Sequence, residues 1–586
     1  MKVSLRLGLY AYRRVNFDKL ELVMSGAKTF IRYILGHLRQ WIVGRIVDGE
    51  DDISPRTREI LLQLDPFTTF FVSNVPQNII DENADAITQD MVETSEVNLG
   101  WKKTGKGFHD WGNVDMSKAT QTFQITKDLA FTMMEEDDFL GKMPLKTRLA
   151  ALAQKAPFFP LVDNIVELKS KEEGKQLLLD LNLNPTNAYN TYGSDDMNSD
   201  AIFSRIFFYG IGCVLIATQK VESSYEDLGP FVADMPLQDL EVRDGYRPYG
   251  ARIHFDKDQK VTGIYDYHKK TLVKPGDAAW ECTKFIAKST ALNLITVREH
   301  LVWSHLIGSN EGCKASIECL PPSHPIRRLL TVFTLRTNTV NYRAYYTLVG
   351  EYSVLHRLTG LTYDSLTKVL ESSYEECSIF QPFPDLPITP AVQNLSNKGK
   401  FPYRSEGVSY YNIVYKFVVA WLVESGESAL DHHARKFYEK VQSATKNHKY
   451  VLPDFESEDA MAKLLTQFIF IVTAYHEMIG TLTDYTTVQD GMATRCVDGK
   501  TESDAQSLLY GAFLSANTNL TVLPMLMQPF EKFFGQGGAP LWEIERWADF
   551  QEDLASQSAL VQAADAKRDV EFKIFDPAKF ECSISV

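Results

Sequence analysis

The sequence predicts a large, mainly α-helical fold with a few short strands. Apolar side chains recur at helical spacing along most of the chain, whereas the alternation typical of strands is scarce. The 586 residues are 44% hydrophobic and 23% charged, which is ordinary globular composition and sufficient for a large core. Length alone allows three to four domains, but no repeat and no glycine-, serine- or proline-rich linker divides the chain. One large unit with an extension is therefore compatible with the sequence.

The individual elements follow from local patterns. Helical spacing marks the segments 18–47, 145–155, 196–218, 285–308, 325–359, 408–445 and 459–482. Two short extended runs, Arg252–Phe255 and Val261–Tyr267, flank the turn sequence DKDQ and predict a β-hairpin. The proline-rich stretch 381–403 predicts a loop at the surface or at the rim of a pocket.

Charge and cysteine usage exclude several classes of function. The net charge of −15 argues against nucleic acid and against charge-driven adhesion to anionic membranes, since both need a basic face. The longest apolar run, Phe468–Tyr475, is too short to span a bilayer, and Arg6 interrupts any signal-peptide core. Seven scattered cysteines without a C-x-x-C pair indicate reduced thiols. We expect a cytoplasmic monomer that has no stable membrane anchor.

His300 and His305 lie five residues apart in the apolar stretch 285–307. A regular α-helix would turn their side chains about 140° apart, because each residue adds roughly 100°. A widened π-type turn, which tends to occur at functional sites, would bring both imidazoles onto one face, where they could share a divalent metal. The alternative is a pair of hydrogen-bonded core histidines.

His476 ends a second segment that is apolar on every side, 464–475. Helices without a polar face belong in the centre of a large domain, so His476 could meet the histidine pair across the core. Three buried imidazoles close together are best explained by a shared metal. The sequence His476-Glu477 would also begin the zinc-protease motif H-E-x-x-H, but Gly480 occupies the position of the second histidine.

A series of short motifs surrounds these histidines in a fixed order. They are Asp200-Ala-Ile-Phe203 with Gly210, Trp280-x3-Lys284, His300-Leu-Val-Trp-Ser-His305-Leu-Ile, Leu320-Pro-Pro-Ser-His324-Pro-Ile, Val340-Asn341-Tyr-Arg-Ala344, Phe470-Ile-Val-Thr-Ala-Tyr-His476 and Cys582-Ser-Ile-Ser-Val586. In order and spacing they resemble the signatures of the lipoxygenase family, including W-x-x-A-K, H-L-L-x-T-H-L-V, L-P-x-x-H-P-I and a terminal N-S-I-S-I. The matches span about residues 200–586. The resemblance implies a lipoxygenase-like helical catalytic domain with a metal site between central helices.

The resemblance also implies a site and a reaction. A mononuclear non-haem iron, with manganese as a possibility, would be held by His300, His305, His476 and the terminal carboxylate of Val586. In the family, a metal-bound hydroxide abstracts hydrogen from a polyunsaturated fatty acid, and O₂ adds to give a hydroperoxide; no side chain acts as a classical acid or base. Two further positions, Ala344 and Leu348, match residues of the family's substrate pocket.

The chain also departs from the family pattern. Gly480 stands where the family places a further ligand side chain, and Thr483 replaces a glutamine near the metal. These changes favour, as an alternative, an oxygenase or hydroperoxide isomerase that acts on another lipid or specialised metabolite. A non-catalytic lipid-binding relative is a third interpretation. Residues 1–110 read as helices and loops without the family's β-sandwich domain, so we expect 111–586 to form the catalytic domain, or the two regions to form one unit.

Overall fold

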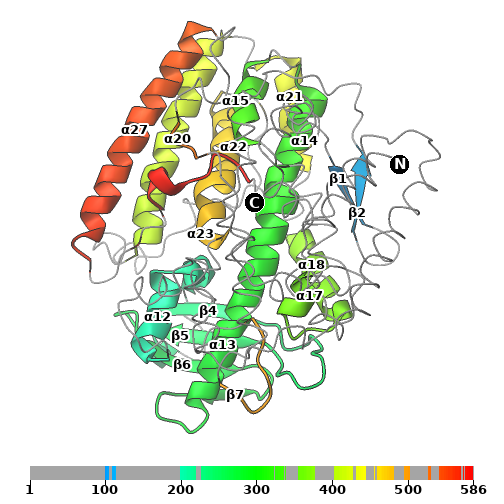
Figure 1. The fold of residues 1–586 in the computed structure, drawn as a ribbon, viewed down its shortest axis with the longest axis vertical. Coiled ribbons are helices and arrows are strands. Elements are labelled where there is room, and N and C mark those ends of the chain that lie inside the picture. Colours follow the sequence, from blue (N-terminus) through cyan, green and yellow to red (C-terminus); the bar gives the residue numbers. More distant parts are fainter. Residues whose placement is uncertain are drawn as a thin grey trace, which may run out of the picture.

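The computed structural model describes the second half of the chain most fully. The described residues are 99–103, 109–113, 198–218, 226–321, 324–334, 337, 354–376, 401–426, 430–443, 455, 458–480, 494–501, 525–528, 540–568, 572 and 575–584. Helices dominate these ranges, and the predicted mainly α-helical class is confirmed (Figure 1). The predicted helices over 18–47 and 145–155 and the loop over 381–403 lie outside the described residues. No described helix is both long and apolar enough to span a bilayer.

Seven described strands form two antiparallel sheets. Strands β1 (Leu99–Lys103) and β2 (His109–Asn113) pair across the predicted domain boundary at residue 110, so the division of the chain into domains stays a prediction. The larger sheet has the strand order β3-β4-β5-β6-β7. Its strands are β3 (Ile216–Thr218), β4 (Phe231–Met235), β5 (Ala251–Phe255), β6 (Val261–Asp266) and β7 (Thr271–Val273). The predicted hairpin is confirmed as β5 and β6, whereas the other three strands were not predicted.

One predicted helix, 196–218, was wrong in its second half. Helix α12 (Asp200–Phe208) begins at Ser199, whose hydroxyl accepts a hydrogen bond from the Ile202 amide. The chain then passes through the 3-10 turn η3 (Ile211–Leu215) into strand β3. Short apolar runs look alike whether they belong to a buried helix or to a buried strand, so periodicity cannot separate them. The α12 helix packs against the five-stranded sheet at one end of the molecule (Figure 1).

A continuous helical rod crosses the middle of the molecule (Figure 1). It consists of α13 (Trp280–Leu294), the π-helix η5 (Ile295–Ser309) and α14 (Asn310–Cys319). Most of its described side chains are buried, as its uniformly apolar sequence predicts. The rod is anchored to α12, because Asp200 accepts hydrogen bonds from the Trp280 indole at 2.8 Å and from the Lys284 ammonium at 2.7 Å.

A second central helix packs beside this rod. It comprises α22 (Glu458–Phe470), the π turn η8 (Ile471–Tyr475) and α23 (His476–Gly480). Two glycines of the rod permit the close approach. A Cβ on Gly308 would lie 2.9 Å from an Ile471 methyl, and one on Gly312 would lie 2.1 Å from the Phe468 ring. At Gly308, the backbone of η5 is therefore in direct contact with a side chain of η8 at the centre of the fold.

Long outer helices cover one side of this centre. Helices α20 (Pro402–Ser425) and α27 (Leu541–Asp565) lie side by side at one edge of the molecule (Figure 1). The predicted segment 408–445 is two helices, because Gly426 ends α20 with a φ of 65° that favours glycine. The remaining described elements are η4 (Glu226–Leu228), α15 (Pro325–Phe333), α17 (Val354–Leu358), α18 (Tyr363–Glu376), α21 (His432–Ser443) and η10 (Pro577–Lys579).

The last described segment, 575–584, runs into the core. Phe580, Cys582 and Ile584 are fully buried, and the Leu526 amide donates to the Phe580 carbonyl at 2.8 Å. The Phe580 ring packs edge-on against Tyr410 of α20, with ring centroids 4.9 Å apart. Tyr410 in turn bonds through its hydroxyl to Thr473 of the π turn η8, at 2.8 Å. Tyr410 thus connects the segment to the central helices.

Candidate metal centre

The π-helix η5 places His300 and His305 on one side of the central rod. The widened turn predicted from their five-residue spacing is present. Serine hydroxyls help to satisfy the carbonyl groups of this segment: Ser304 donates to the Glu299 carbonyl at 3.0 Å, and Ser309 donates to the His305 carbonyl at 2.8 Å. A long π-helix is rare because its hydrogen-bond geometry is unfavourable, and π turns concentrate at functional sites.

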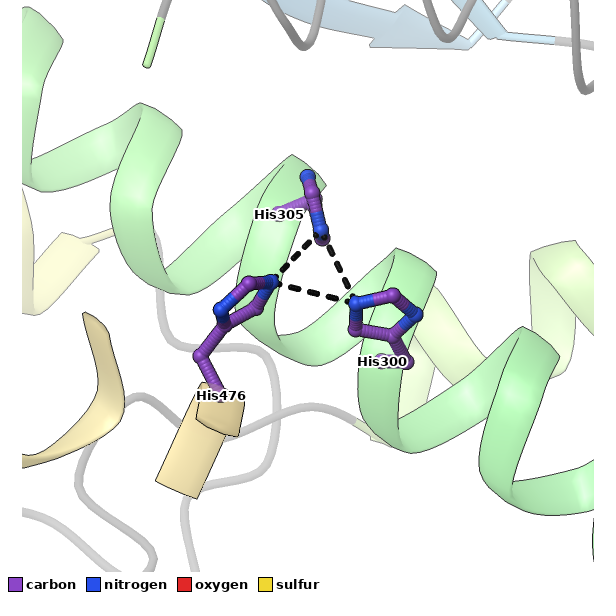
Figure 2. A group of neighbouring side chains, drawn as sticks. All are labelled: His300, His305 and His476. Atoms are coloured by element: carbon purple, nitrogen blue, oxygen red, sulfur yellow. Dashed lines mark hydrogen bonds between the residues drawn. The ribbon is translucent and has the colours of Figure 1, made fainter. Parts of the chain in front are cut away.

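His476 joins the pair from the neighbouring helix. Figure 2 shows the three imidazoles converging on one point, with their Nε2 atoms facing one another. The Nε2 atoms of His300 and His476 are 3.1 Å apart, those of His305 and His300 are 3.2 Å apart, and those of His476 and His305 are 3.1 Å apart. Three imidazole nitrogens thus form a nearly equilateral triangle in the core.

Hydrogen bonding among the rings cannot account for this triangle. In a neutral imidazole each ring nitrogen either carries a hydrogen and donates or carries a lone pair and accepts. Because there are three nitrogen atoms and only two roles, at least two of the atoms must have the same role. That pair would be two lone pairs or two N–H groups about 3.1 Å apart. A cation at the centre removes the conflict, because all three lone pairs can then point at it.

The spacing also fits a metal ion. Nitrogens 3.1–3.2 Å apart would allow all three to bind one ion at typical metal–imidazole distances of about 2.1 Å. The triangle therefore offers three neutral imidazole donors, a set that would suit a transition metal such as iron.

The protonation of the rings agrees with this role. Burial holds the pKa of His300 well below its usual value, and the neighbouring His305 adds to the effect. Burial likewise lowers the pKa of His476, with further contributions from His305 and His300. Both rings are consequently neutral at physiological pH and keep a lone pair available for a metal.

Gly480, the position predicted to lack a ligand side chain, lies directly beside the triangle. A Cβ built on this residue would be 3.4 Å from His300 Nε2 and 3.8 Å from His476 Nε2. A polar side chain at position 480 could therefore reach the same centre, whereas glycine brings no ligand atom. The other predicted site residues, Ala344, Leu348 and Val586, lie outside the described residues, as does Thr483.

Another group of potential metal ligands, Asp431, His432 and His433, lies at the start of α21. Asp431 accepts hydrogen bonds from the amides of His433 and Ala434, which is an ordinary helix cap. His432 is exposed, and His433 bonds through Nδ1 to the Cys319 carbonyl at 3.1 Å. This group has a structural explanation, in contrast to the buried triangle.

Sequence reasoning missed one set of contacts around the triangle. Glu299, next to His300, accepts a hydrogen bond from the phenol of Tyr475, which is next to His476. Burial and this carboxylate hold the pKa of Tyr475 well above its usual value, so the phenol stays protonated and donates. The two residues are far apart in sequence, and the only available signal was that each precedes a predicted ligand.

Comparison with solved structures places this architecture in a known fold. The coral 8R-lipoxygenase superposes with a TM-score of 0.65 over 88% of this chain and 82% of that chain, at 13% identity. The manganese lipoxygenase of Gaeumannomyces graminis superposes with a TM-score of 0.61 over 88% of this chain and 100% of that chain, at 12% identity. The polyunsaturated fatty acid lipoxygenase ALOX15 of Homo sapiens is 22% identical over 334 residues. The chain is related to the lipoxygenases.

The relationship to the lipoxygenases is distant in sequence. ALOX15 of Pongo abelii matches to the same extent as the human protein, over 53% of this chain and 49% of the relative. The chain therefore spans about half the length of these curated relatives, and no protein-family model matches it. A lipoxygenase structure in complex with arachidonate has a TM-score of 0.62 at 13% identity, over 88% of this chain and 82% of that chain. The lipoxygenase fold predicted from the short motifs is confirmed.

Proposed function

We propose that this protein is a mononuclear non-haem iron dioxygenase that converts a polyunsaturated fatty acid to a hydroperoxide, with manganese as a possible substitute metal. The observation that carries the proposal is the triangle of His300, His305 and His476 nitrogens, which hydrogen bonding alone does not explain. Kinship with lipoxygenases supports oxygenation of a fatty acid as the reaction class.

The residues of the site have separable tasks in this proposal. When bound, the metal supplies the redox chemistry that removes hydrogen from the methylene between two cis double bonds. The three histidines hold the ion as neutral ligands, since burial keeps His300 and His476 deprotonated. Apolar side chains of the two central helices exclude water from the surrounding core. O₂ would then add to the substrate radical, and return of the electron and proton removed in the first step would convert the resulting peroxyl radical to the hydroperoxide.

The terminal carboxylate of Val586 is our proposed fourth protein ligand. Support comes from the buried path of the preceding segment, where Cys582, Ser583 and Ile584 are all inaccessible to solvent. Thr337 donates a hydrogen bond to the Ile584 carbonyl at 3.5 Å, which holds the segment inside the core. Ala344 and Leu348 remain our proposed substrate-pocket residues on the basis of the motif alone. The monomeric state and the cytoplasmic location also stay predictions.

A second candidate function rests on Gly480. Because no side chain at this position can reach the metal, the site has one ligand fewer than the family pattern. The number and type of ligands set the potential and affinity of a metal. This difference favours an oxygenase or hydroperoxide isomerase that uses the same centre on another lipid or specialised metabolite. A non-catalytic lipid-binding protein is the outcome if no metal binds.

Two measurements on the purified chain test the proposal. Elemental analysis is expected to find about one equivalent of iron or manganese per chain. Incubation with linoleic or arachidonic acid is expected to generate conjugated-diene absorbance. His476→Ala should lose both the metal and the absorbance, whereas His432→Ala, which removes an exposed histidine, should keep both.

The possible outcomes separate the candidate functions. Absence of bound iron or manganese after reconstitution would contradict both enzyme proposals and leave the lipid-binding alternative. A metal-loaded protein that forms no conjugated diene from either acid would contradict the dioxygenase proposal. In that case, consumption of a fatty acid hydroperoxide without O₂ uptake would favour the isomerase.

A further inference from the structure

A buried hydrogen bond joins the two π segments immediately next to their histidines. The Tyr475 hydroxyl donates to the Glu299 Oε2 atom, and these residues lie 176 positions apart in sequence. Glu299 directly precedes His300 in η5, and Tyr475 directly precedes His476 at the end of η8. Glu299 is only 2% exposed. The contact therefore links the two helices at the level of the nitrogen triangle.

The Glu299 carboxylate is fixed from its other side as well. Its Oε1 atom accepts a hydrogen bond from Arg298 Nε at 2.7 Å. The Arg298 guanidinium lies over the Trp303 ring, 5.0 Å from the ring centroid, and the Trp303 indole donates to the Ser373 carbonyl of α18 at 2.9 Å. Both carboxylate oxygens thus have partners, and the network continues to a third helix. A buried carboxylate with this many partners has a single available orientation.

The position of this bond allows it to influence the geometry of the metal centre. Each partner is one peptide unit from a histidine, so a shift of Glu299 relative to Tyr475 would also displace the two imidazoles. The π segments cannot hold this geometry well alone, because their hydrogen bonding is weaker than that of an α-helix. Metal affinity is sensitive to groups that orient the ligands, and their loss typically costs about 10–100-fold.

We propose that Glu299 and Tyr475 are positioning residues that set the separation of the His300 and His476 rings and thereby the affinity for the metal. The inference rests on the proposed metal centre and goes beyond it by assigning these two residues a role. Neither side chain touches the centre directly. Their effect passes through the backbone of the two π segments.

A matched control is a tyrosine of α20 that bonds to the same π turn, η8. Tyr410 is fully buried, and its hydroxyl bonds to Thr473 at 2.8 Å, which links η8 to α20 instead of to η5. Tyr410→Phe and Tyr475→Phe therefore make the same chemical change in similar surroundings. Only Tyr475→Phe breaks a bond between the two ligand-bearing segments. Glu299→Gln is a milder variant, because its amide oxygen can still accept the tyrosine hydrogen bond.

The test is titration of the metal-depleted full chain with Mn²⁺ alone, followed by calorimetry and by electron paramagnetic resonance of the bound ion. Tyr475→Phe is expected to raise the Kd about tenfold or more, and Glu299→Gln is expected to raise it less. Tyr410→Phe should stay within about twofold of wild type. The double variant Glu299→Gln/Tyr475→Phe should bind no more than about twofold more weakly than Tyr475→Phe, since both changes act on one bond.

The spectrum distinguishes positioning from general destabilisation. A change in the resonance of bound Mn²⁺ in Tyr475→Phe and Glu299→Gln, but not in Tyr410→Phe, supports the inference. If Tyr475→Phe and Tyr410→Phe have equal Kd values and equal spectra, the bond is merely structural and the inference is wrong. If wild type binds no Mn²⁺ or Fe²⁺ at all, the proposed function fails first and the inference falls with it.

Discussion

At the scale of single residues, the environment of each histidine determines what it can do. His432 is exposed, and His324 caps α15 by accepting a hydrogen bond from the Ile326 amide through Nδ1. His300 and His476 instead turn their Nε2 atoms toward a third imidazole in surroundings that keep them neutral. The same side chain thus serves as a cap at a helix end and as a candidate ligand in the core, depending on its partners.

Gly480→Asn should tighten metal binding. The new Cβ would lie in ordinary contact with His300 Nε2, at 3.4 Å, and the amide oxygen could extend toward the centre. One added oxygen ligand is expected to lower the Kd about tenfold, which corresponds to about 1.4 kcal/mol. Competition with a chelator measures the change. Gly480→Ala adds the same Cβ without a ligand atom and should leave the Kd unchanged; equal affinities for the two variants would show that position 480 does not reach the metal.

At the scale of elements, the two π segments explain how the site is assembled. An i, i+5 pair of histidines shares one face only because η5 is wound more widely than an α-helix. The neighbouring η8 ends one residue before His476 and approaches η5 closely at Gly308. The π winding of each helix therefore brings the histidine rings together, and it also allows the close packing of the two helices that this convergence needs.

Gly308→Ala should weaken this packing. Its Cβ would lie 2.7 Å from the Trp303 carbonyl oxygen and 2.9 Å from the Ile471 Cγ2 atom, so the two segments must separate. Overpacking of this kind costs about 1–3 kcal/mol of unfolding free energy, although alanine favours helix formation. Denaturant titration of the metal-free chain measures the loss. Gly480→Ala, whose Cβ meets only ordinary contacts, is the control and should lose nothing; a stable Gly308→Ala variant would contradict the close approach.

The sequence could predict much of this centre but less of its surroundings. The spacing of His300 and His305 indicated that a π turn would bring both rings onto one face, and the apolar run before His476 predicted that this residue lies in the core. The five-stranded sheet was missed because β3 has only three residues and resembles a continued helix. The Glu299–Tyr475 bond depends on how two helices pack, and no local pattern reports a contact between residues 176 positions apart.

At the scale of the whole molecule, buried charge connects the outer helices. Glu406 of α20 forms an ion pair with Arg568, just beyond the end of α27, and Arg568 also bonds to Asp565 at 2.7 Å. Arg328 of α15 forms two hydrogen bonds of 2.6 Å each to the buried Glu543 at the start of α27. Ion pairs therefore connect both ends of α27 to neighbouring helices. Because the carboxyl groups of these pairs titrate, the stability of the molecule depends on pH.

The stability of the wild type relative to Glu406→Gln should fall as pH rises. Burial raises the pKa of Glu406 from 4.5 to about 7, despite the attraction of Arg568. A carboxyl group whose pKa is higher in the folded state stabilises the fold below its unfolded pKa, and this contribution is lost as pH rises through the folded value. The difference in unfolding free energy between wild type and variant should drop by about 1–3 kcal/mol between about pH 4.5 and 7.5. Denaturant titrations across this range measure it, and a difference that stays flat or grows would contradict the shift.

The burial of segment 575–584 has a consequence for the order of folding during synthesis. Phe575 packs against Tyr403 and Phe470, and Phe580 packs against Tyr410, so residues made later fill space between helices made earlier. Those helices can form as they leave the ribosome, but the gap between them closes only after segment 575–584 has also left it. Until then the apolar walls of the centre stay exposed, which is the condition under which large proteins depend on chaperones.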